Sequence, residues 1–597
     1  MNARASRTAR RRTSVAAVII LIVLLAFVAR LFDIQVVRAQ EHIDDSLRVG
    51  GFVGSNELFG VRGSIIDADG QVLASSTLRY DVAVDPALAD DVTRIDEGGD
   101  EYVESWGHLA ERIGEIVDLP GSEIEQIADE ALEANPDARW ASLKKGLSTE
   151  QYRELIDLDA PMLTFEPQKS RAYPNGAVGG NLVGFTSSDD TPLAGYEMLE
   201  DACLESTDGS VSYQTSGDGG VRIPGTTQET PAVDGGTLQL TIDTDLSWYL
   251  LQMLKEEVET QQAKSGSIMV ADAKTGAVKA AVDYPTLDPN DPGAADEENR
   301  GSRVFTTSFE PGSTFKAITT ATVLDQGAAT TMTPVTAASY EEFPNGARVG
   351  DSHDHPQYTY TLTGAMIDSS NVALSKLGDL VTEDTRHDYL EKFGVGTKTP
   401  IDFTGEQPGV LHPTDAWDSQ THYTTTFGQA FTVTMPQVVS AYQTLANGGV
   451  RAPLHIVEDC TSADGKVTAP DLPDDERVIG EQAANDTVSV LENVANEGSV
   501  SELIQVPGYR IAAKTGTAQK TDGNGNYKSG IYFTSLVGMA PAEDPQYIVM
   551  VTLDEPRRVT SSSATAPAFQ KAMTQVLKTY RVQPSDEPYE PLPKFAE

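Results

Sequence analysis

The residues best suited to chemistry lie in one short stretch near the middle of the chain. In Phe309-Glu-Pro-Gly-Ser-Thr-Phe-Lys316, Ser313 stands three residues before Lys316, so a helix would place both side chains on one face. A serine hydroxyl is a weak nucleophile unless a base lies beside it, and a lysine amine can be that base when burial and a neighbouring cation lower its pKa. The stretch therefore predicts a nucleophile, Ser313, at the start of a helix, with Lys316 as its proton acceptor.

A serine and a lysine at this spacing form a weak signal on their own. Ser142-Leu-Lys-Lys145 has the same spacing, in a polar stretch with no supporting motif. Two further motifs follow the first match in order, Ser369-Ser-Asn371 and Lys514-Thr-Gly-Thr517, and they strengthen it. A second Lys-Thr-Gly at 274–276 precedes the nucleophile between two predicted strands, and we interpret it as a turn.

The expected chemistry is acyl transfer, which needs a nucleophile, a proton path, an oxyanion site and a clamp for the substrate. We expect the Ser369 hydroxyl to relay a proton between Lys316 and a leaving amine, and the Asn371 amide to hold Lys316 or the substrate backbone. The backbone N–H groups of Ser313 and Thr517 would form the oxyanion site. Taken alone, Ser-Ser-Asn before an apolar run is also typical of a helix N-cap.

The last motif follows a segment whose alternation predicts a strand. Gly516 would let a substrate lie close to an edge strand. Lys514, Thr515 and Thr517 would supply donors for a substrate carboxylate. Lys514 would also disfavour protonation of Lys316, because the two side chains carry like charges.

Two clusters resemble metal sites, and we interpret neither as one. Asp351, His353, Asp354 and His355 are close in sequence, but consecutive loop residues cannot all point at one ion, and no separated third ligand accompanies them. Asp522-Gly-Asn-Gly-Asn526 lacks the next glycine and the final glutamate of a calcium loop, and we interpret it as a hairpin turn. We expect no metal and no cofactor.

Length and composition narrow the class of protein. A chain of 597 residues predicts two or three domains. Its formal net charge of −45 argues against a nucleic-acid partner, because phosphate binding needs a basic surface. The two cysteines, Cys203 and Cys460, are far apart in sequence, and we expect two unpaired thiols in different domains.

The N-terminus predicts a membrane anchor. Five arginines within residues 4–12 precede an uncharged apolar run from Val15 to Ala29. At ~1.5 Å per residue this run spans only ~22 Å of a ~30 Å hydrocarbon core, and the apolar residues of 31–34 extend it. A cleaved signal peptide is the alternative, but no small-residue cleavage site follows. We expect an uncleaved anchor over residues 14–37, with residues 1–13 in the cytoplasm and the rest outside.

Changes in composition and hydrophobic pattern divide the remaining chain into domains. Residues 38–235 predict an N-terminal domain with a helical insert near 100–160, and a tract rich in glycine, aspartate and serine ends it. A strand pair, the helix that bears Ser313, a helical middle, further strands and a final helix predict a mixed α/β domain over 236–583. The tail, 584–597, is rich in proline and glutamate and is predicted to be disordered.

Together the motifs resemble those of class B penicillin-binding proteins, the membrane-anchored peptidoglycan D,D-transpeptidases, and the likeness covers nearly the whole chain. It also rests on shorter segments, which are Arg62–Asp67, Gly195–Glu197, Leu240–Asp243, Phe393–Gly396, Phe427–Gln429 and Asn447–Gly449. The ending Ala566-Pro-Ala-Phe-Gln-Lys-Ala-Met573 is most similar to that of the septal, FtsI-type branch. The chain departs from the family at Ala430, where glycine is usual.

This resemblance implies a fold and a reaction. The fold would be the serine penicillin-recognising transpeptidase fold, an α/β (α+β) sheet with flanking helices and a helical subdomain, behind an elongated α+β pedestal of the dimerisation type. Ser313 would attack the D-Ala-D-Ala carbonyl of a stem peptide, expel D-alanine and pass the acyl group to an amine of a second stem peptide. β-Lactams would acylate Ser313 as substrate mimics.

The resemblance also implies a location and partners. The enzyme would act in the plasma membrane at the division septum, beside a glycosyltransferase of the SEDS (shape, elongation, division and sporulation) family and other division proteins. A D,D-carboxypeptidase and a membrane-anchored β-lactam sensor share the same pocket and are the alternatives. The products separate transpeptidase from carboxypeptidase, and a sensor usually carries several membrane spans with an intracellular effector.

Overall fold

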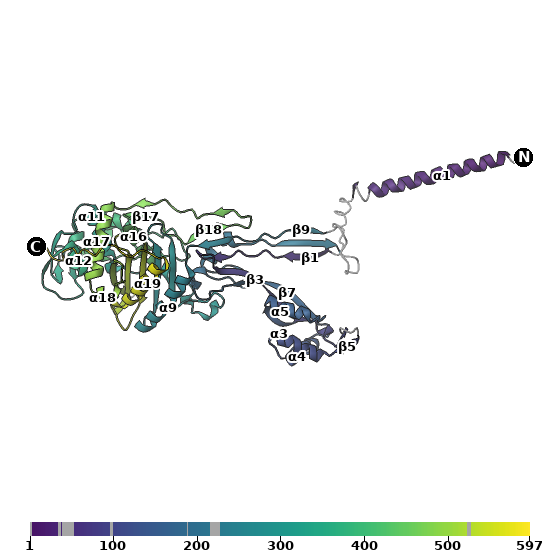
Figure 1. The fold of residues 1–597 in the computed structure, drawn as a ribbon, viewed down its shortest axis with the longest axis horizontal. Helices are drawn as coiled ribbons and strands as arrows, with labels where there is room; N and C mark the ends of the chain where they lie inside the picture. The colour runs from purple at the N-terminus through teal and green to yellow at the C-terminus, as the bar shows by residue number, and fades with distance from the viewer. Residues whose placement is uncertain are drawn as a thin grey trace. The chain divides into compact units, whose positions relative to one another are not determined.

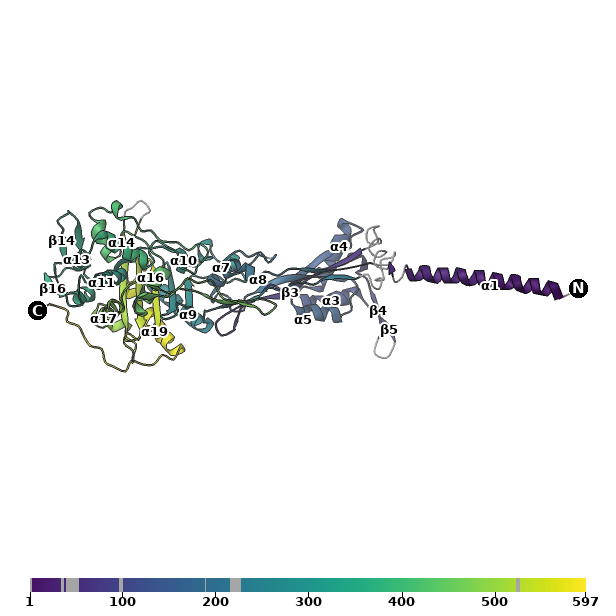
Figure 2. The same ribbon diagram turned by 90° about the horizontal axis from the view of Figure 1, so that it is seen from above.

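The computed structural model, drawn in Figures 1 and 2, describes residues 3–33, 37–38, 53–95, 100–187, 189–214, 227–521 and 527–596. The predicted hairpin turn at 522–526 and residues 34–36 of the predicted anchor lie outside these ranges. The chain forms two compact units, which are described separately. One unit comprises residues 1–61 and 206–234, and the other comprises residues 62–205 and 235–597.

The first unit contains a long helix and a small sheet. Helix α1 extends from Ala3 to Phe32, and its Arg11–Phe32 part is the one helix in the described ranges that is long and apolar enough to cross a membrane. At ~1.5 Å per residue this part covers about 33 Å, which matches a ~30 Å hydrocarbon core. The sheet is antiparallel with the order β1-β8-β9, where the strands are β1 (Val53–Leu58), β8 (Gly209–Gln214) and β9 (Gln228–Thr230).

The second unit begins with strands that carry three helices. The strands are β2 (Ile65–Ile66), β3 (Val72–Val84), β6 (Ala141–Leu147) and β7 (Leu163–Ala172). The helices are α3 (Trp106–Val117), α4 (Gly121–Ala134) and α5 (Thr149–Asp157). Buried Leu109, Ile113 and Ile124 join these helices to β3 and β6 in one apolar cluster. A short hairpin of β4 (Val92–Ile95) and β5 (Glu101–Glu104) precedes α3.

Strand β6 lies within the insert that the sequence predicted to be helical. It also shows whether the second Ser-x-x-Lys match could be catalytic. Ser142 and Lys145 both lie on β6. Successive residues of a strand point to opposite faces, so residues three apart cannot share a face. Ser142 and Lys145 therefore cannot act as a nucleophile and its base.

Three strands from later in the sequence complete a seven-stranded sheet. Its order is β19-β18-β10-β2-β3-β6, with β7 also paired to β3, and the added strands are β10 (Thr237–Leu240), β18 (Val457–Thr461) and β19 (Val467–Thr468). Leu238 of β10 lies opposite Cys460 of β18. One sheet thus contains strands from both sides of the boundary predicted at residue 235.

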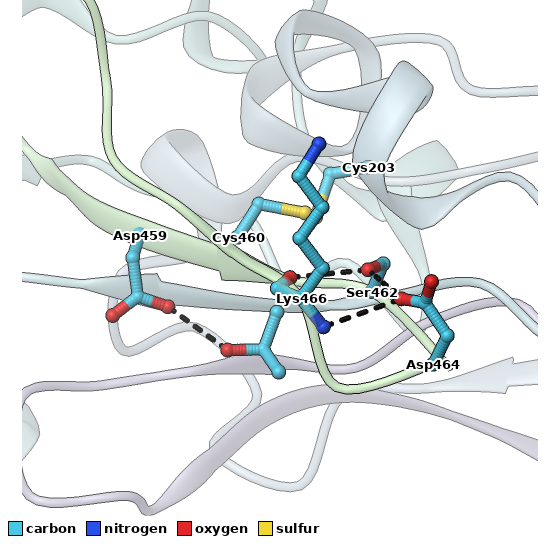
Figure 3. The surroundings of a disulfide bond; sticks show 7 residues. Cys203, Asp459, Cys460, Ser462, Asp464 and Lys466 are labelled. Atoms are coloured by element: carbon cyan, nitrogen blue, oxygen red, sulfur yellow. Dashed lines mark hydrogen bonds between the residues drawn. A yellow bond between two sulfur atoms is a disulfide. The ribbon is translucent and has the colours of Figure 1, made fainter.

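The prediction of two unpaired thiols is wrong, because Cys203 and Cys460 form a disulfide (Figure 3). Cys203 lies in helix α8 (Asp201–Leu204), and its carbonyl oxygen accepts a hydrogen bond of 2.7 Å from Gly236 N. The pairing of β10 with β18 then brings Cys460 beside that point, with 6.1 Å between the two Cα atoms. The pair could not be seen in the sequence, since the two cysteines are separated by 257 positions.

A five-stranded antiparallel sheet forms the centre of the same unit. Its order is β12-β11-β23-β22-β21, and the strands are β11 (Ser265–Asp272), β12 (Val278–Tyr284), β21 (Ala512–Thr521), β22 (Tyr527–Ala540) and β23 (Tyr547–Asp554). Strand β21 is an edge strand. The turn between β11 and β12 holds the second Lys-Thr-Gly, with the Asp272 carboxylate accepting hydrogen bonds from Lys274 N and Thr275 N. Its interpretation as a turn is confirmed.

Helices cover both faces of this sheet, as the apolar residues of β11 require. Ile268 and Val270 join the cluster with α9 (Thr244–Gln261) and α19 (Ala566–Thr579), which lie side by side in both views (Figures 1 and 2). Met269 and Ala271 face the opposite cluster. That cluster holds α11 (Lys316–Asp325), α13 (Asn371–Gly378), α14 (Glu383–Lys392), α16 (Met435–Ala446) and α17 (Glu481–Glu497).

The prediction of a disordered tail is wrong for residues 584–596, which pack on the second unit. Tyr589 donates hydrogen bonds to Asn493 and Glu497 of α17. Thr361 N and its hydroxyl donate to the carbonyl oxygens of Lys594 and Pro593, and the Phe595 ring stacks on Tyr360. The proline-rich composition was misleading, because these residues bind through backbone carbonyls and two aromatic rings rather than through a helix or sheet of their own.

Candidate active site

Ser313 lies in a tight turn that leads directly into a helix. The 3₁₀ turn η5 (Gly312–Phe315) precedes α11, so Ser313 stands one turn before Lys316, close to the predicted position. The Thr314 hydroxyl donates to the Pro311 carbonyl oxygen at 2.8 Å and closes the turn. Ser313 is half-buried, and its hydroxyl has no hydrogen-bond partner within the described ranges, so it is not engaged by the fold.

Lys316 is completely buried and reaches the second motif. Its Nζ donates to the carbonyl oxygen and, at 3.1 Å, to the hydroxyl of Ser369. Burial and, next, the charge of Lys514 hold the pKa of Lys316 well below its usual value, while Asp351 acts in the opposite direction. The amine is therefore poised to be neutral and to accept a proton, as its predicted role requires.

Lys514, on edge strand β21, reaches the same serine from the other side. Its Nζ lies 3.0 Å from Ser369 Oγ, and its side chain is 1% exposed. Burial lowers the pKa of Lys514 to about 7. The sequence predicted that Lys514 would bind a substrate carboxylate, but in this structure its amine contacts the Ser369 hydroxyl between the two lysines.

The Ser-Ser-Asn motif contains a helix N-cap at Ser370 and, at Ser369, a hydroxyl that contacts both lysines. Ser370 is the N-cap of α13, and its hydroxyl accepts from Ala373 N at 3.0 Å. Ser369, just after α12 (Leu362–Ile367), has a φ of +53°, a conformation that few non-glycine residues adopt. This backbone directs Ser369 to the lysines and leaves the capping to Ser370.

Asn371 does not hold Lys316, which contradicts one of its two predicted roles. Its Nδ2 donates instead to the Gly350 carbonyl oxygen at 2.8 Å, while the Lys316 amine contacts Ser369. The hydrogen bond fixes the amide at the end of strand β15 (Arg348–Gly350). Binding of the substrate backbone stays a prediction for the amide oxygen.

Gly516 is required by the packing of the fold, and its role beside a bound substrate stays a prediction. A Cβ at this position would lie 2.5 Å from Ser535 Oγ and 3.0 Å from the Pro311 carbonyl oxygen. Since Pro311 belongs to the turn before Ser313, the absence of a side chain lets the nucleophile's turn pack against β21. Thr515 is half-buried and Thr517 is exposed, and the Thr517 hydroxyl accepts from Ser562 N at 3.0 Å.

Asp351 and His355 support the site. The sequence did not predict this role, because both residues were considered only as metal ligands. Asp351 accepts hydrogen bonds from the Ser370 hydroxyl at 2.7 Å and from Val372 N at 3.0 Å. His355 Nε2 lies 2.8 Å from the Asp351 carboxylate, while His353 and Asp354 are exposed. The signal available was a carboxylate shortly before a Ser-Ser-Asn helix start, which needs partners for its N–H groups.

Ala430 shows why the family favours glycine at this position. Its φ is +66°, in the left-handed region that glycine adopts without cost. Its N–H donates to Glu310 at 2.9 Å, and Tyr527 donates to the same carboxylate at about the same distance, 3.0 Å. Alanine thus adopts a left-handed backbone conformation here, beside the Ser313 turn. Burial raises the pKa of Glu310.

One group in the described ranges has potential metal-ligand atoms close together, formed by His387, Asp388 and Glu391 on α14. Both carboxylate residues are exposed, and nothing further at this helix indicates an ion. The Ser313 site itself contains two lysine amines, which are poor surroundings for a cation.

Comparisons with known proteins agree with this geometry. Residues 266–574 match the family model described as the penicillin-binding protein transpeptidase domain, and residues 58–240 match the penicillin-binding protein dimerisation domain. Penicillin-binding protein PbpB of Mycolicibacterium smegmatis is 32% identical over 98% of this chain and 92% of its own length. Peptidoglycan D,D-transpeptidase FtsI of Escherichia coli K12 is 30% identical over 88% of this chain and 84% of its own.

A solved structure gives the same result for the fold. Penicillin binding protein 3 of Mycobacterium tuberculosis, crystallised with aztreonam, matches with a TM-score of 0.69 and 26% identity, over 91% of this chain and all of the crystallised one. The transpeptidase match contains Ser313, Lys316, Ser369 and Lys514, and the dimerisation match contains the strands and helices around β3. With this domain pair and these full-length relatives, the chain belongs to the class B penicillin-binding proteins, of the FtsI and PbpB kind.

Proposed function

We propose that Ser313 is the acyl-accepting residue of this serine-type peptidoglycan D,D-transpeptidase, with Lys316 as its base and Ser369 as its proton relay. One observation supports these roles above the others. The Ser369 hydroxyl lies 3.1 Å from the buried Lys316 amine and 3.0 Å from the buried Lys514 amine. Lys316 itself stands one turn after Ser313. A hydroxyl between two amines with lowered pKa values is a suitable path for a proton.

In the first half-reaction the Ser313 oxygen attacks the carbonyl of the penultimate D-alanine in a stem peptide. The hydroxyl proton passes to the neutral Lys316 amine as the oxygen–carbon bond forms. The N–H groups of Ser313 and Thr517 would stabilise the oxyanion. The carbon–nitrogen bond then breaks, and a proton from Lys316, relayed through Ser369, leaves with the amine of D-alanine.

The second half-reaction reverses this proton path. An amine of a second stem peptide attacks the acyl-enzyme carbonyl, and its proton moves through Ser369 to Lys316. Cleavage of the ester returns a proton to the Ser313 oxygen and leaves a new amide cross-link. We assign the substrate carboxylate to Thr515 and Thr517 on β21, because edge strands can bind an extended peptide through their open side.

We further propose that the domain from residue 62 onward lies outside the cytoplasm, at the division septum. The disulfide between Cys203 and Cys460 supports the orientation, because such bonds persist in oxidising compartments. The five N-terminal arginines support a cytoplasmic start for α1. Similarity to FtsI supports the septal role, and on that ground we propose a SEDS-family glycosyltransferase as partner.

The nucleophile is tested by labelling the full chain in detergent with a fluorescent penicillin. Wild type and Ser142→Ala should carry the label, because Ser142 only has the matching spacing. Ser313→Ala should lose it, since no other group would supply the acyl-accepting oxygen. Label retained by Ser313→Ala at the wild-type level would refute the assignment.

The reaction is tested on the products formed from stem-peptide substrates. Cross-linked dimers are expected when an acceptor amine is present. Release of D-alanine with trimmed peptide alone would instead support the D,D-carboxypeptidase, and penicillin binding without any product would support the sensor.

A further inference from the structure

A buried ion pair between Asp351 and His355, which lie on one loop, supports the segment Ser369-Ser370-Asn371. Asp351 binds Ser370 through its hydroxyl and Val372 through its backbone N–H, on either side of Asn371. The side chains of Asp351 and His355 are 3% and 7% exposed. Asp351 is therefore removed from water and receives three hydrogen bonds, two from the start of α13 and one from His355.

The hydrogen bonds of His355 define its protonation state. Its Nε2 lies 2.8 Å from the Asp351 carboxylate, and its Nδ1 lies 2.7 Å from the Pro356 carbonyl oxygen. Carbonyl and carboxylate oxygens only accept hydrogen bonds, so both ring nitrogens must carry a proton. A ring with two N–H groups is an imidazolium, which pairs with the buried Asp351 charge.

The surroundings of His355 favour this charge. Its ring stacks on Tyr358 with 5.4 Å between ring centres and faces Tyr360 edge-on. Asp368 is the next carboxylate, and it is paired with Lys594 at 2.6 Å. The exposed His353 ring lies 5.7 Å away. Burial alone would lower the pKa of His355, but its hydrogen bonds to Asp351 and Pro356 raise it.

The Asp351 carboxylate of the pair also acts on Lys316. Asp351 alone tends to raise the pKa of Lys316, which would keep a proton on the proposed base. An imidazolium at His355 offsets that charge, so that Lys316 can stay neutral while Asp351 remains ionised. The same pair therefore fixes the position of the motif and limits the effect of its own carboxylate on the base.

We propose that Asp351 and His355 are positioning residues for the acylation reaction, in which an imidazolium at His355 holds Asp351 against Ser370 and Val372 and so places Ser369 between the two lysines. This inference rests on the roles proposed above for Ser313, Lys316 and Ser369. It assigns no contact with substrate to either Asp351 or His355.

The test measures the rate constant for acylation of the full chain by a fluorescent penicillin between pH ~5.5 and ~9. His355→Leu removes the donor to Asp351, and we expect acylation to slow by about tenfold or more, because small displacements of catalytic groups have such effects. His355→Gln keeps an N–H donor that does not titrate. It should retain a rate within about threefold of wild type. It should also lack the decline at high pH that we expect of wild type as His355 deprotonates.

His353→Gln is the matched control, on the same loop but exposed, and it should leave rate and pH profile unchanged. A His355→Leu rate equal to wild type would overturn the proposal, and so would equal losses in the Leu and Gln variants. Should the Leu variant not fold, nitrogen chemical shifts of wild-type protein with labelled histidine decide, with the His355 signal assigned from the Gln variant. A neutral ring at pH ~6 would overturn the proposal.

The outcomes separate this inference from the proposed function. Penicillin labelling of Ser313→Ala would refute the nucleophile without changing the state of His355. A neutral His355 ring, or normal acylation by His355→Leu, would refute the positioning role while Ser313 remained the labelled residue.

Discussion

At the scale of single residues, the site depends on two lysines that share one hydroxyl. Lys316 and Lys514 both donate to Ser369 Oγ, and both are buried, so each amine resists protonation. Burial is the main cause in each, and Lys514 adds like-charge repulsion to Lys316. Because the pKa of Lys514 is about 7, its charge is present in the acid range, where Lys316 would otherwise begin to gain a proton.

This arrangement predicts the effect of Lys514→Gln on the pH dependence of acylation. Loss of the Lys514 charge should raise the pKa of Lys316, so the acid side of the rate profile should move to higher pH by about one unit. The position of that side is the readout, since the maximal rate should also fall when Ser369 loses a donor. The measurement is acylation by a fluorescent penicillin across the pH range.

Lys520→Gln serves as the control for this experiment. Lys520 lies on the same strand and pairs with Asp554 and Glu555, so its loss should leave the acid side in place. An unshifted profile in Lys514→Gln would show that Lys514 does not depress the pKa of Lys316.

The pH dependence of stability follows from His355 at the same scale. A histidine whose folded pKa is raised stabilises the fold fully below its unfolded pKa of about 6.5, and this contribution is lost as pH rises through the higher folded pKa. The ion pair with Asp351 should therefore stabilise the α13 start most in the acid to neutral range.

Residue types and order were enough to predict Ser313, Lys316 and the proximity of Ser369 and Lys514, because the three motifs are specific in combination. The role of Asn371 toward Lys316 was not predictable, since it depends on where the Gly350 carbonyl lies. Asp351 was visible as a residue, but only the fold shows that it supports the start of α13 rather than an ion.

At the scale of elements, the C-terminal segment is part of the support for the second motif. Its Lys594 pairs with Asp368, the residue before Ser369, at 2.6 Å. Its backbone lies against α12, where a Cβ on Gly364 would be only 1.7 Å from the Lys594 carbonyl oxygen. The sequence could not predict this contact, because proline-rich composition reports the lack of a helix or strand and not the lack of a docking site.

The close approach at Gly364 predicts that Gly364→Ala displaces this segment. The clash should lower the free energy of unfolding by roughly 1–3 kcal/mol, despite the higher helix propensity of alanine. Limited trypsin digestion should then cleave the chain after Arg581 faster than in wild type, and the midpoint of thermal unfolding should fall. Gly301→Ala is the control, since a Cβ there would meet no atom within 4 Å. Equal digestion of both variants would contradict the contact.

At the scale of the whole molecule, the second unit joins its early and late segments in two ways. Strands β10 and β18 extend the sheet that begins with β2 and β3, and the disulfide links α8 to β18. Buried ion pairs of Arg62 and Arg171 with Glu197 lie within the early segment. The sequence predicted a helical middle where β18 lies, and pairing across more than two hundred residues could not be predicted, because one short strand fits several partners equally well.

Because Cys203 and Cys460 are far apart in the sequence, we expect their disulfide to stabilise the folded protein. A crosslink that closes a large loop restricts the unfolded chain, and its loss typically costs 2–5 kcal/mol. We therefore expect Cys203→Ser with Cys460→Ser to unfold at a temperature several degrees lower than wild type. Neither cysteine contacts the Ser313 site, so the acylation rate at room temperature should stay within about twofold of wild type.

A reductant supplies the internal control for this last prediction. It should lower the unfolding temperature of the wild type to that of the double variant and leave the double variant unchanged, because only the wild type has a bond to reduce. The bond should also be present in protein purified from membranes and absent from a fragment without α1 that is produced in a reducing cytosol. A wild-type protein whose thiols react freely before reduction would contradict both the pairing and the oxidising location inferred from it.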